Sequence, residues 1–133
     1  VRRSFERTSA ENPKDDALFL VMESHAGEIV GSISTHHCDR RTGTFSYGVA
    51  VRREHQRQGY AAEAIRLVLR YFFEELRYQK VTVHVAADNT ASARLHEGLG
   101  LTLEGRLRRM GFTRGQYVDE LVFGLTREEF AAG

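Results

Sequence analysis

The chain has 133 residues, of which 41% are hydrophobic and 28% are charged, and its formal net charge is +1. This length supports one hydrophobic core rather than two, and no apolar run approaches the ~20 residues that span a membrane. The near-neutral charge gives no overall attraction to nucleic acid or to an anionic membrane. We therefore predict a single cytoplasmic domain over residues 1–133, without membrane contact.

Cysteine and histidine usage argues against a metal site. The single cysteine, Cys38, cannot form an internal disulfide, and no Cys/His spacing matches a zinc site. His36 and His37 are adjacent on a predicted strand, so we expect them to point to opposite faces, which disfavours a shared ion. The sequence predicts no metal.

Turn signals and periodicity predict the first elements in chain order. Apolar runs at 17–22 and 29–35 flank a turn at 24–27, which predicts a β-hairpin. A second turn at 39–43 leads into a strand over 44–51. A long helix follows, because large apolar residues recur after Ala61 at helical intervals. These residues are Ile65, Val68, Phe72 and Leu76.

The second half of the chain predicts a strand, a short helix and a closing strand pair. Residues 80–86 alternate valine with polar residues, and the strand-helix-strand order makes 44–51 and 80–86 parallel neighbours. Asp88 or Asn89 caps a helix that ends near Gly100. Residues 101–109 and 117–125 form an antiparallel pair. The predicted order is β-β-β-α-β-α-β-β, an α/β (α+β) arrangement.

The segment between residues 51 and 61 has the features of a phosphate cradle. A strand end runs through polar and basic residues into Gly59, and a helix starts at once. Glycine lets the backbone approach a ligand closely, and the first helical turn offers unpaired N–H groups and the positive end of the helix dipole. The nucleoside-triphosphate loop and the dinucleotide fingerprint are both missing from this sequence. We predict that the ligand is an anion, a pyrophosphate.

Two ordered motifs resemble those of the GNAT acetyltransferases. Residues 56–61, Gln-x-x-Gly-x-Ala, are similar to the acetyl-coenzyme A signature Gln/Arg-x-x-Gly-x-Gly/Ala. Residues 89–101, which begin Asn-Thr-Ala-Ser-Ala-Arg-Leu-His-Glu, resemble the second segment of the family. The stretch from 103 to 120 is similar to the branch that acetylates the N-termini of ribosomal proteins. The resemblance covers roughly residues 17–130.

The resemblance implies the GNAT acyl-CoA N-acyltransferase fold and acetyl-CoA as co-substrate. In this fold a mixed, mostly antiparallel sheet is flanked by helices, and a central parallel strand pair splays apart at the cofactor site. Members usually open with another strand and two helices that wall the acceptor site, so we expect an N-terminally short domain here. The cofactor contacts implied by the resemblance fall on Val49, Ala50, Val51, Arg57, Gln58, Gly59, Tyr60, Ala61, Ala62 and Asn89.

Direct acetyl transfer needs a stabilised oxyanion and a proton for the leaving thiolate. In relatives, a strand bulge after residues such as Tyr47 and Gly48 frees a backbone N–H for the acetyl oxygen, and a tyrosine seven residues after the asparagine protonates the thiolate. That tyrosine position is His96 in this chain. Ser92, one helical turn earlier, is the competing donor, and an ordinary helix-face residue is the other interpretation of His96. His84, where some relatives carry a glutamate, is the candidate base.

We expect an N-acetyltransferase that acts on a primary amine without a metal. At pH 7 roughly 14% of an α-amine is neutral, against about 0.04% of a lysine amine. A histidine base copes more easily with the α-amine, so a protein or peptide N-terminus is the expected acceptor. A small-molecule amine, such as a polyamine or an aminoglycoside, is the alternative acceptor.

Two other classes of function stay open at this point. A catalytically weak coenzyme A-binding sensor or assembly subunit would fit a chain that has lost the N-terminal wall and the tyrosine. A nucleic-acid-binding module would use the arginines, although the net charge argues against it. The arginines that such a module would use are Arg52, Arg53, Arg57, Arg106, Arg108, Arg109 and Arg114. Whether the chain forms a homodimer also stays open.

Overall fold

The computed structural model describes residues 4–8, as backbone alone, and residues 16–133. The chain divides into two compact units, Val1–Tyr78 and Gln79–Gly133, and the arrangement of each is given separately. Most of the segment that precedes the first predicted strand lies outside the described residues. The single domain over residues 1–133 stays a prediction.

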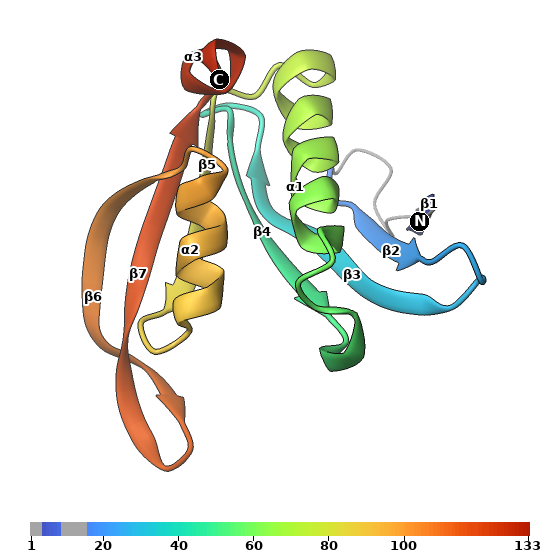
Figure 1. Ribbon diagram of the computed structural model, residues 1–133. Helices are drawn as coiled ribbons and strands as arrows, with labels where there is room; N and C mark the ends of the chain where they lie inside the picture. The colour runs from blue at the N-terminus through green and yellow to red at the C-terminus, as the bar shows by residue number, and fades with distance from the viewer. Residues whose placement is uncertain (1–3, 9–15) are drawn as a thin grey trace. The chain divides into compact units, whose positions relative to one another are not determined.

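The first unit is built on strands that pair in the order in which they follow along the chain (Figure 1). Strands β2 (Phe19–Glu23), β3 (Ile29–Asp39) and β4 (Thr44–Val51) form antiparallel ladders, joined by the two predicted turns. A further strand, β1 (Ser4–Thr8), pairs antiparallel with β2. The sequence did not predict β1, because its five residues contain a single large apolar side chain.

The irregularity between β3 and β4 lies in β3. The ladder is regular from Gly31↔Val51 to His36↔Ser46, and the register shifts only after His36. The bulge expected after Tyr47 and Gly48 is therefore absent from this ladder.

The bulge in β3 also changes the orientation of the two adjacent histidine side chains. His37 has a φ of 52°, and the rings of His36 and His37 lie 5.1 Å apart, edge to face. The prediction that they point to opposite faces is wrong, because the bulge breaks the alternation of the strand.

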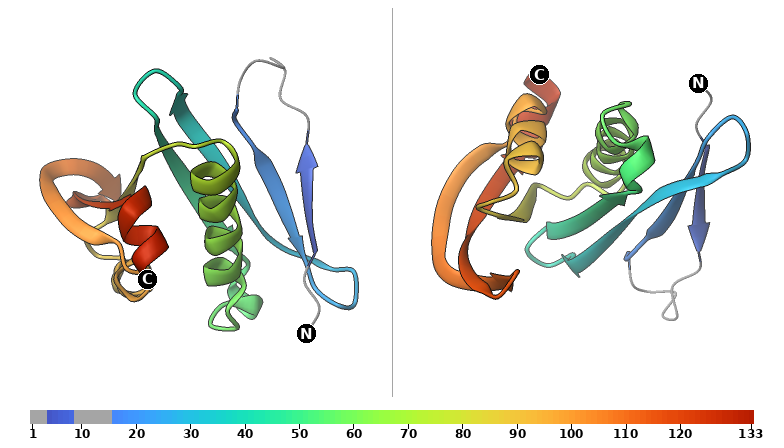
Figure 2. Two further views of the ribbon diagram at one scale, coloured as in Figure 1. Left: turned by 90° about the horizontal axis from the view of Figure 1, so that it is seen from above. Right: turned by 60° about the horizontal axis from the view of Figure 1, so that its bottom comes forward.

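The long helix packs on one face of β3 and β4 (Figure 2). α1 (Tyr60–Arg70) buries Ile65 and Val68, as the sequence predicts. It then continues as a π-helical turn, Tyr71–Glu75, in which the N–H of Leu76 donates to the carbonyl of Tyr71 at 3.0 Å. The end of the predicted α-helix is thus a π turn.

The π turn places two consecutive aromatic rings in the core. Phe72 and Phe73 are both buried, and their ring centroids lie 4.2 and 5.8 Å from that of Phe45 on β4. Neighbouring residues of an α-helix are about 100° apart around its axis, so the wider turn helps both rings to reach Phe45.

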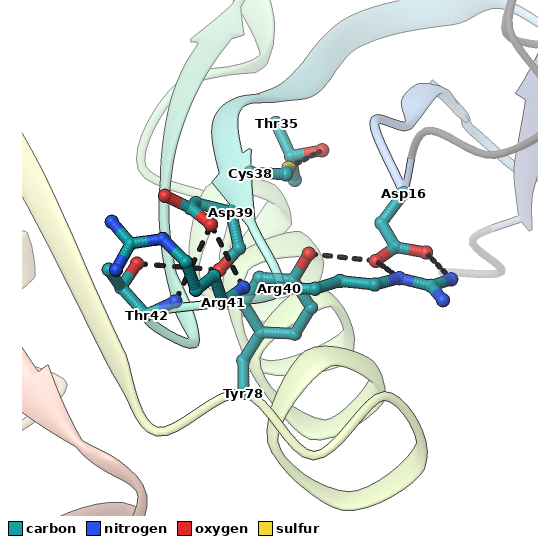
Figure 3. A network of polar contacts seen from close by, with 8 residues as sticks. All are labelled: Asp16, Thr35, Cys38, Asp39, Arg40, Arg41, Thr42 and Tyr78. Atoms are coloured by element: carbon teal, nitrogen blue, oxygen red, sulfur yellow. Dashed lines mark hydrogen bonds and ion pairs between the residues drawn. The ribbon is translucent and has the colours of Figure 1, made fainter.

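A polar network fastens the end of this helix to the sheet (Figure 3). The Asp16 carboxylate accepts hydrogen bonds from the Tyr78 hydroxyl and from Nε and Nη2 of Arg40, each at 2.7 Å. Tyr78 is only 2% exposed, and burial together with Asp16 raises its pKa above the usual range. The network therefore joins the β3–β4 turn, the segment before β2 and the segment after the π turn.

Replacing Tyr78 by phenylalanine should lower the free energy of unfolding by about 1–3 kcal/mol, because a buried hydrogen bond to a carboxylate is lost. Urea unfolding followed by circular dichroism measures this change. Tyr71→Phe is the matched control, since no hydrogen bond of its hydroxyl is recorded among the described residues. Equal stability of the Tyr78→Phe variant and the wild type would show that the network does not stabilise the unit.

The second unit pairs β7 (Gln116–Thr126) antiparallel with both β5 (Lys80–Ala86) and β6 (Thr102–Thr113). α2 (Thr90–Gly98) begins after Asn89, whose Oδ1 accepts from the N–H of Ser92 at 3.1 Å. This confirms Asn89 as the cap. Both strands of the predicted closing pair are longer than expected, and β6 contains two register shifts.

A final helix, α3 (Arg127–Ala132), was not predicted. Thr126 and Glu129 form a capping box at its start, a signal that the sequence contains. The expected parallel neighbours, 44–51 and 80–86, belong to different units, and their pairing stays a prediction. In the described part of the chain, no helix is long and apolar enough to cross a membrane.

Candidate functional site

The predicted cradle lies wholly in the first unit, between the end of β4 and the start of α1. Gly59 is the N-cap residue, with a φ of 84° and no side-chain cap. The first bond of the helix runs from the N–H of Glu63 to the carbonyl of Gly59, at 3.1 Å. The N–H groups of Tyr60, Ala61 and Ala62 precede it, so the helix itself gives them no acceptor.

Gln56, the first residue of the motif, closes the loop onto the strand. Its Nε2 donates to the carbonyl of Val51 at 3.0 Å, and the intervening residues form a 3-10 turn, Arg53–His55. Arg57 then has a φ of 63°, so the chain turns through two left-handed residues before the helix. The sequence analysis gave no role to the side chain of Gln56, and the structure shows that its hydrogen bond to Val51 shapes the loop.

Of the three arginines around the loop, one is held by contacts within the protein and two could contact a bound anion. Nη1 of Arg52 donates to the carbonyl of Ile29 at 3.0 Å, and its Nε lies 3.7 Å from Glu54. Arg53 and Arg57 are exposed, and among residues 16–133 neither guanidinium has a recorded ion-pair partner. Two guanidinium groups and a helix N-terminus together fit a pyrophosphate.

The other predicted cofactor residues differ in exposure. Tyr60 is 2% exposed, with its ring centroid 6.2 Å from that of His55, so its side chain is a packing residue. The remaining predicted positions are exposed or half-buried along β4, the loop and the first turn of α1; these are Val49, Ala50, Val51, Gln58, Ala61 and Ala62.

The second unit contains a histidine–carboxylate pair that the sequence did not reveal. Nδ1 of His84 on β5 lies 2.8 Å from Oε1 of Glu120 on β7, and the two side chains are 49% and 28% exposed. A carboxylate at this distance favours the tautomer with a proton on Nδ1, which leaves Nε2 able to accept a proton. Glu120 is 36 residues from His84 and reaches it only through the register of β5 with β7.

His96 lies inside the second unit and not on its surface. It is 1% exposed, with its ring stacked on Phe123 at a centroid distance of 6.0 Å. Nδ1 lies 2.8 Å from the Ser92 carbonyl oxygen and 3.5 Å from the Ser92 hydroxyl, which assigns the Nδ1 proton to the carbonyl. Burial lowers the pKa of His96, partly offset by the hydrogen bond to Ser92.

This geometry disfavours His96 as the proton donor to a thiolate. The neutral ring holds its one N–H proton against a backbone carbonyl, and the lowered pKa keeps the ring neutral at pH 7. Ser92 is half-buried and keeps a hydroxyl that can donate. Of the three predicted catalytic residues, His84 has the most suitable surroundings for acid-base chemistry.

The lowered pKa of His96 has a consequence for stability. As the pH falls below the ordinary value of 6.5, the unfolded chain takes up a proton at this position while the folded chain does not, so folding becomes less favourable. The free energy of unfolding should therefore fall more steeply below pH 6.5 in the wild type than in His96→Phe. Urea titrations of both proteins at pH 7.5, 6.5 and 5.5 test this, and parallel pH dependences would contradict it.

The two groups of residues lie in different units. The cradle belongs to residues 49–62, whereas His84, Ser92, His96 and Glu120 belong to the second unit. Within the residues that the structure describes, no three His, Cys, Asp or Glu side chains gather into a metal site.

Comparisons with known proteins agree with this fold. Residues 1–102 match the model of the acetyltransferase (GNAT) domain family. The SPbeta prophage-derived uncharacterized N-acetyltransferase YokL of Bacillus subtilis is 50% identical over 117 residues, which are 88% of this chain and 66% of that protein. The putative ribosomal N-acetyltransferase YdaF of the same organism is 28% identical over 104 residues, 78% of this chain and 57% of that protein.

A solved structure has the same fold. The spermidine/spermine N-acetyltransferase SpeG from Vibrio cholerae, in complex with manganese ions, superposes with a TM-score of 0.83 at 23% identity, covering 90% of this chain and 71% of that one. This likeness confirms the predicted α/β fold. The chain spans less than two thirds of the length of YokL and of YdaF. The matched domain model and the relative at 50% identity show that the chain belongs to the GNAT acetyltransferase family.

Proposed function

We propose that this chain is an acetyl-CoA-dependent N-acetyltransferase that acts on a primary amine, with a protein or peptide N-terminus as acceptor. Acetyl-CoA would supply an activated acetyl thioester. The observation that carries the proposal is the cradle, in which Gly59, the first turn of α1 and two arginines without a recorded ion pair among residues 16–133 lie on one segment. This cradle is the same segment as the GNAT signature at residues 56–61.

In this proposal the pyrophosphate is held by backbone N–H groups at the start of α1, and two arginine side chains add positive charge. The N–H groups of Ala61 and Ala62 would donate to it, with Arg53 and Arg57 adding charge from the loop. Gln56 would act indirectly, by holding the loop on Val51. Asn89 would serve as a helix cap, since its Oδ1 is already engaged with the N–H of Ser92.

His84 would remove the proton from the acceptor amine. Glu120 holds Nδ1, so the proton would arrive at Nε2. Ser92 would be the candidate donor to the leaving thiolate. The base in this proposal is the residue that the sequence suggested, and the structure adds Glu120 as its carboxylate partner.

The proposal also names the class of amine that accepts the acetyl group. The similarity to YdaF and the stretch from 103 to 120 support a protein N-terminus, whereas the similarity to SpeG, described as a spermidine/spermine acetyltransferase, supports a polyamine. A coenzyme A-binding sensor is the third candidate. A cytoplasmic location is part of the proposal as well, whereas the homodimer stays open.

One acetylation screen separates these candidates. Peptides with free N-termini, N-blocked peptides with one lysine, spermidine and an aminoglycoside would each be incubated with acetyl-CoA and the protein, and the products identified by mass spectrometry. We expect the free N-termini to be acetylated fastest. Exclusive modification of spermidine would assign a polyamine acceptor, and coenzyme A binding without any product would assign a sensor.

A further inference from the structure

Gly31 on β3 lies against the end of β4, just before the cradle loop. It is the ladder partner of Val51, the last residue of β4. A Cβ placed on Gly31 would overlap the carbonyl oxygen of Ala50 and lie 3.0 Å from the Cα of Val51. Both of these atoms belong to the backbone, so no side-chain rotation can relieve the overlap. A glycine inside a strand is typical of a place where another backbone approaches closely.

An irregularity in the neighbouring ladder bends β3 at the same place. The register of β2 with β3 shifts between Met22 and Glu23, which leaves Val30 as an additional residue on β3. A bulge of this kind bends its strand and increases the local twist, and bulges are common beside functional sites. The bend at Val30 and the missing side chain at Gly31 therefore act on the same stretch of β4.

Two hydrogen bonds hold the residue after β4 to this part of β3. The N–H of Arg52 donates to the carbonyl of Val30 at 2.7 Å, and Nη1 of Arg52 donates to the carbonyl of Ile29 at 3.0 Å. Beyond Arg52 the chain enters the 3-10 turn and then the cradle. Residues 29–31 thus support the end of β4, and we call them the β3 platform.

The β3 platform is connected to the cradle through Val51. The carbonyl of Val51 accepts the hydrogen bond from Nε2 of Gln56, so the loop closes on the residue that Gly31 faces. Groups that bind a ligand must be held within about 0.5 Å of their productive positions by the residues behind them. A displacement of Val51 would move the loop, and the N–H groups at the start of α1 with it.

We propose that the β3 platform positions the coenzyme A site, and that Gly31 is the residue that lets β4 lie close enough for this. The inference rests on the proposed function. Gly31 would contact neither the cofactor nor the acceptor, and it lies outside both the signature at 56–61 and the predicted cofactor contacts. Alanine at this position would push the end of β4 away from β3 and weaken coenzyme A binding, although every group that contacts the cofactor is still present.

A purely structural role for Gly31 makes a different prediction. An overlap that strains only the ladder lowers stability and leaves the affinity of the folded protein unchanged. Ile33→Val is the matched control, because Ile33 lies on the same strand, is 1% exposed and loses a methyl group without placing an atom against β4. This variant should be less stable than the wild type but bind coenzyme A equally well.

The test measures coenzyme A affinity and stability side by side. Isothermal titration with coenzyme A and urea unfolding would be carried out on the wild type, Ile33→Val, Gly31→Ala, Gln56→Leu and the Gly31→Ala/Gln56→Leu double variant. We expect Gly31→Ala to bind coenzyme A about tenfold more weakly than the wild type. Because Gly31 and Gln56 both act through Val51, the loss in the double variant should be smaller than the product of the two single losses.

Arg52→Met keeps the inference testable if Gly31→Ala does not fold. It removes the hydrogen bond from the exposed Arg52 side chain to Ile29 and leaves the strand pairing in place. We expect it to weaken coenzyme A binding at low and at high salt alike. Salt would screen a direct contact between the Arg52 charge and a phosphate, so a positional effect is the one that persists.

The outcomes separate this inference from the proposed function. If the wild type binds coenzyme A and a folded Gly31→Ala protein binds it equally well, the inference is wrong and the proposed function stands. Independent losses in the double variant would also overturn it. If Gly31→Ala does not fold, wild-type affinity in Arg52→Met, or a loss that disappears at high salt, would overturn it. A wild-type protein that does not bind coenzyme A would refute the proposed function, and this inference with it.

Discussion

Replacing Gly59 by valine is expected to lower the affinity for coenzyme A by about 100-fold or more, because a side chain there displaces the pyrophosphate from the N–H groups of α1. Two charge-assisted hydrogen bonds, at about 1.5–3 kcal/mol each, correspond to at least this factor. The backbone reinforces the effect, since a φ of 84° lies in the left-handed region that valine avoids. Isothermal titration with coenzyme A measures the loss.

Backbone strain alone would also destabilise such a variant, so the control must carry the same strain elsewhere. Gly27, in the turn between β2 and β3, has a φ of 82° and no atom within 4 Å of an added Cβ. Gly27→Val should therefore cost a comparable amount of stability and leave coenzyme A affinity unchanged. If a folded Gly59→Val protein binds coenzyme A as well as the wild type does, the cradle is not the pyrophosphate site.

The second large effect is expected at His84. His84→Gln keeps a group that can donate to Glu120 but removes the base, and general base catalysis typically contributes a factor of ~100 or more. Turnover should therefore fall by about 100-fold, while coenzyme A affinity stays at the wild-type value because the cradle is untouched. Steady-state kinetics with a free-N-terminus peptide would give both quantities.

Glu120 should act through His84. Glu120→Gln is expected to lower turnover by about tenfold, and combining it with His84→Gln should add little, because residues that act as a unit are not additive. His25→Gln, an exposed histidine in the β2–β3 turn, is the control. Wild-type turnover in His84→Gln would remove His84 from the mechanism, and additive losses in the double variant would separate Glu120 from it.

The sequence predicted those parts of the fold that are encoded locally. The alternation of valines predicted β5, the apolar stripe predicted α1 with Ile65 and Val68 buried, and Gly59 marked the place where α1 begins. Each of these signals lies within a dozen neighbouring residues. For the same reason β1, with one large apolar residue in five, was missed.

The missed features depend on contacts that no local pattern shows. Glu120 reaches His84 because β5 and β7 pair in one register, and a shift by one residue would turn the carboxylate to the other face. The burial of His96 likewise depends on Phe123 from a distant strand. The π turn was missed because periodicity cannot distinguish one added residue from a continuing α-helix.

The two register shifts in β6 have a consequence for solubility. β6 lies at one edge of its unit, and it exposes apolar side chains over much of its length. A flat strand of this kind would offer its free backbone groups to other chains and seed fibrils. The irregularities between Leu103 and Gly105 and between Leu107 and Gly111 interrupt that row of donors and acceptors and twist the strand, so the β6–β7 hairpin can stay exposed without recruiting further chains into a growing sheet.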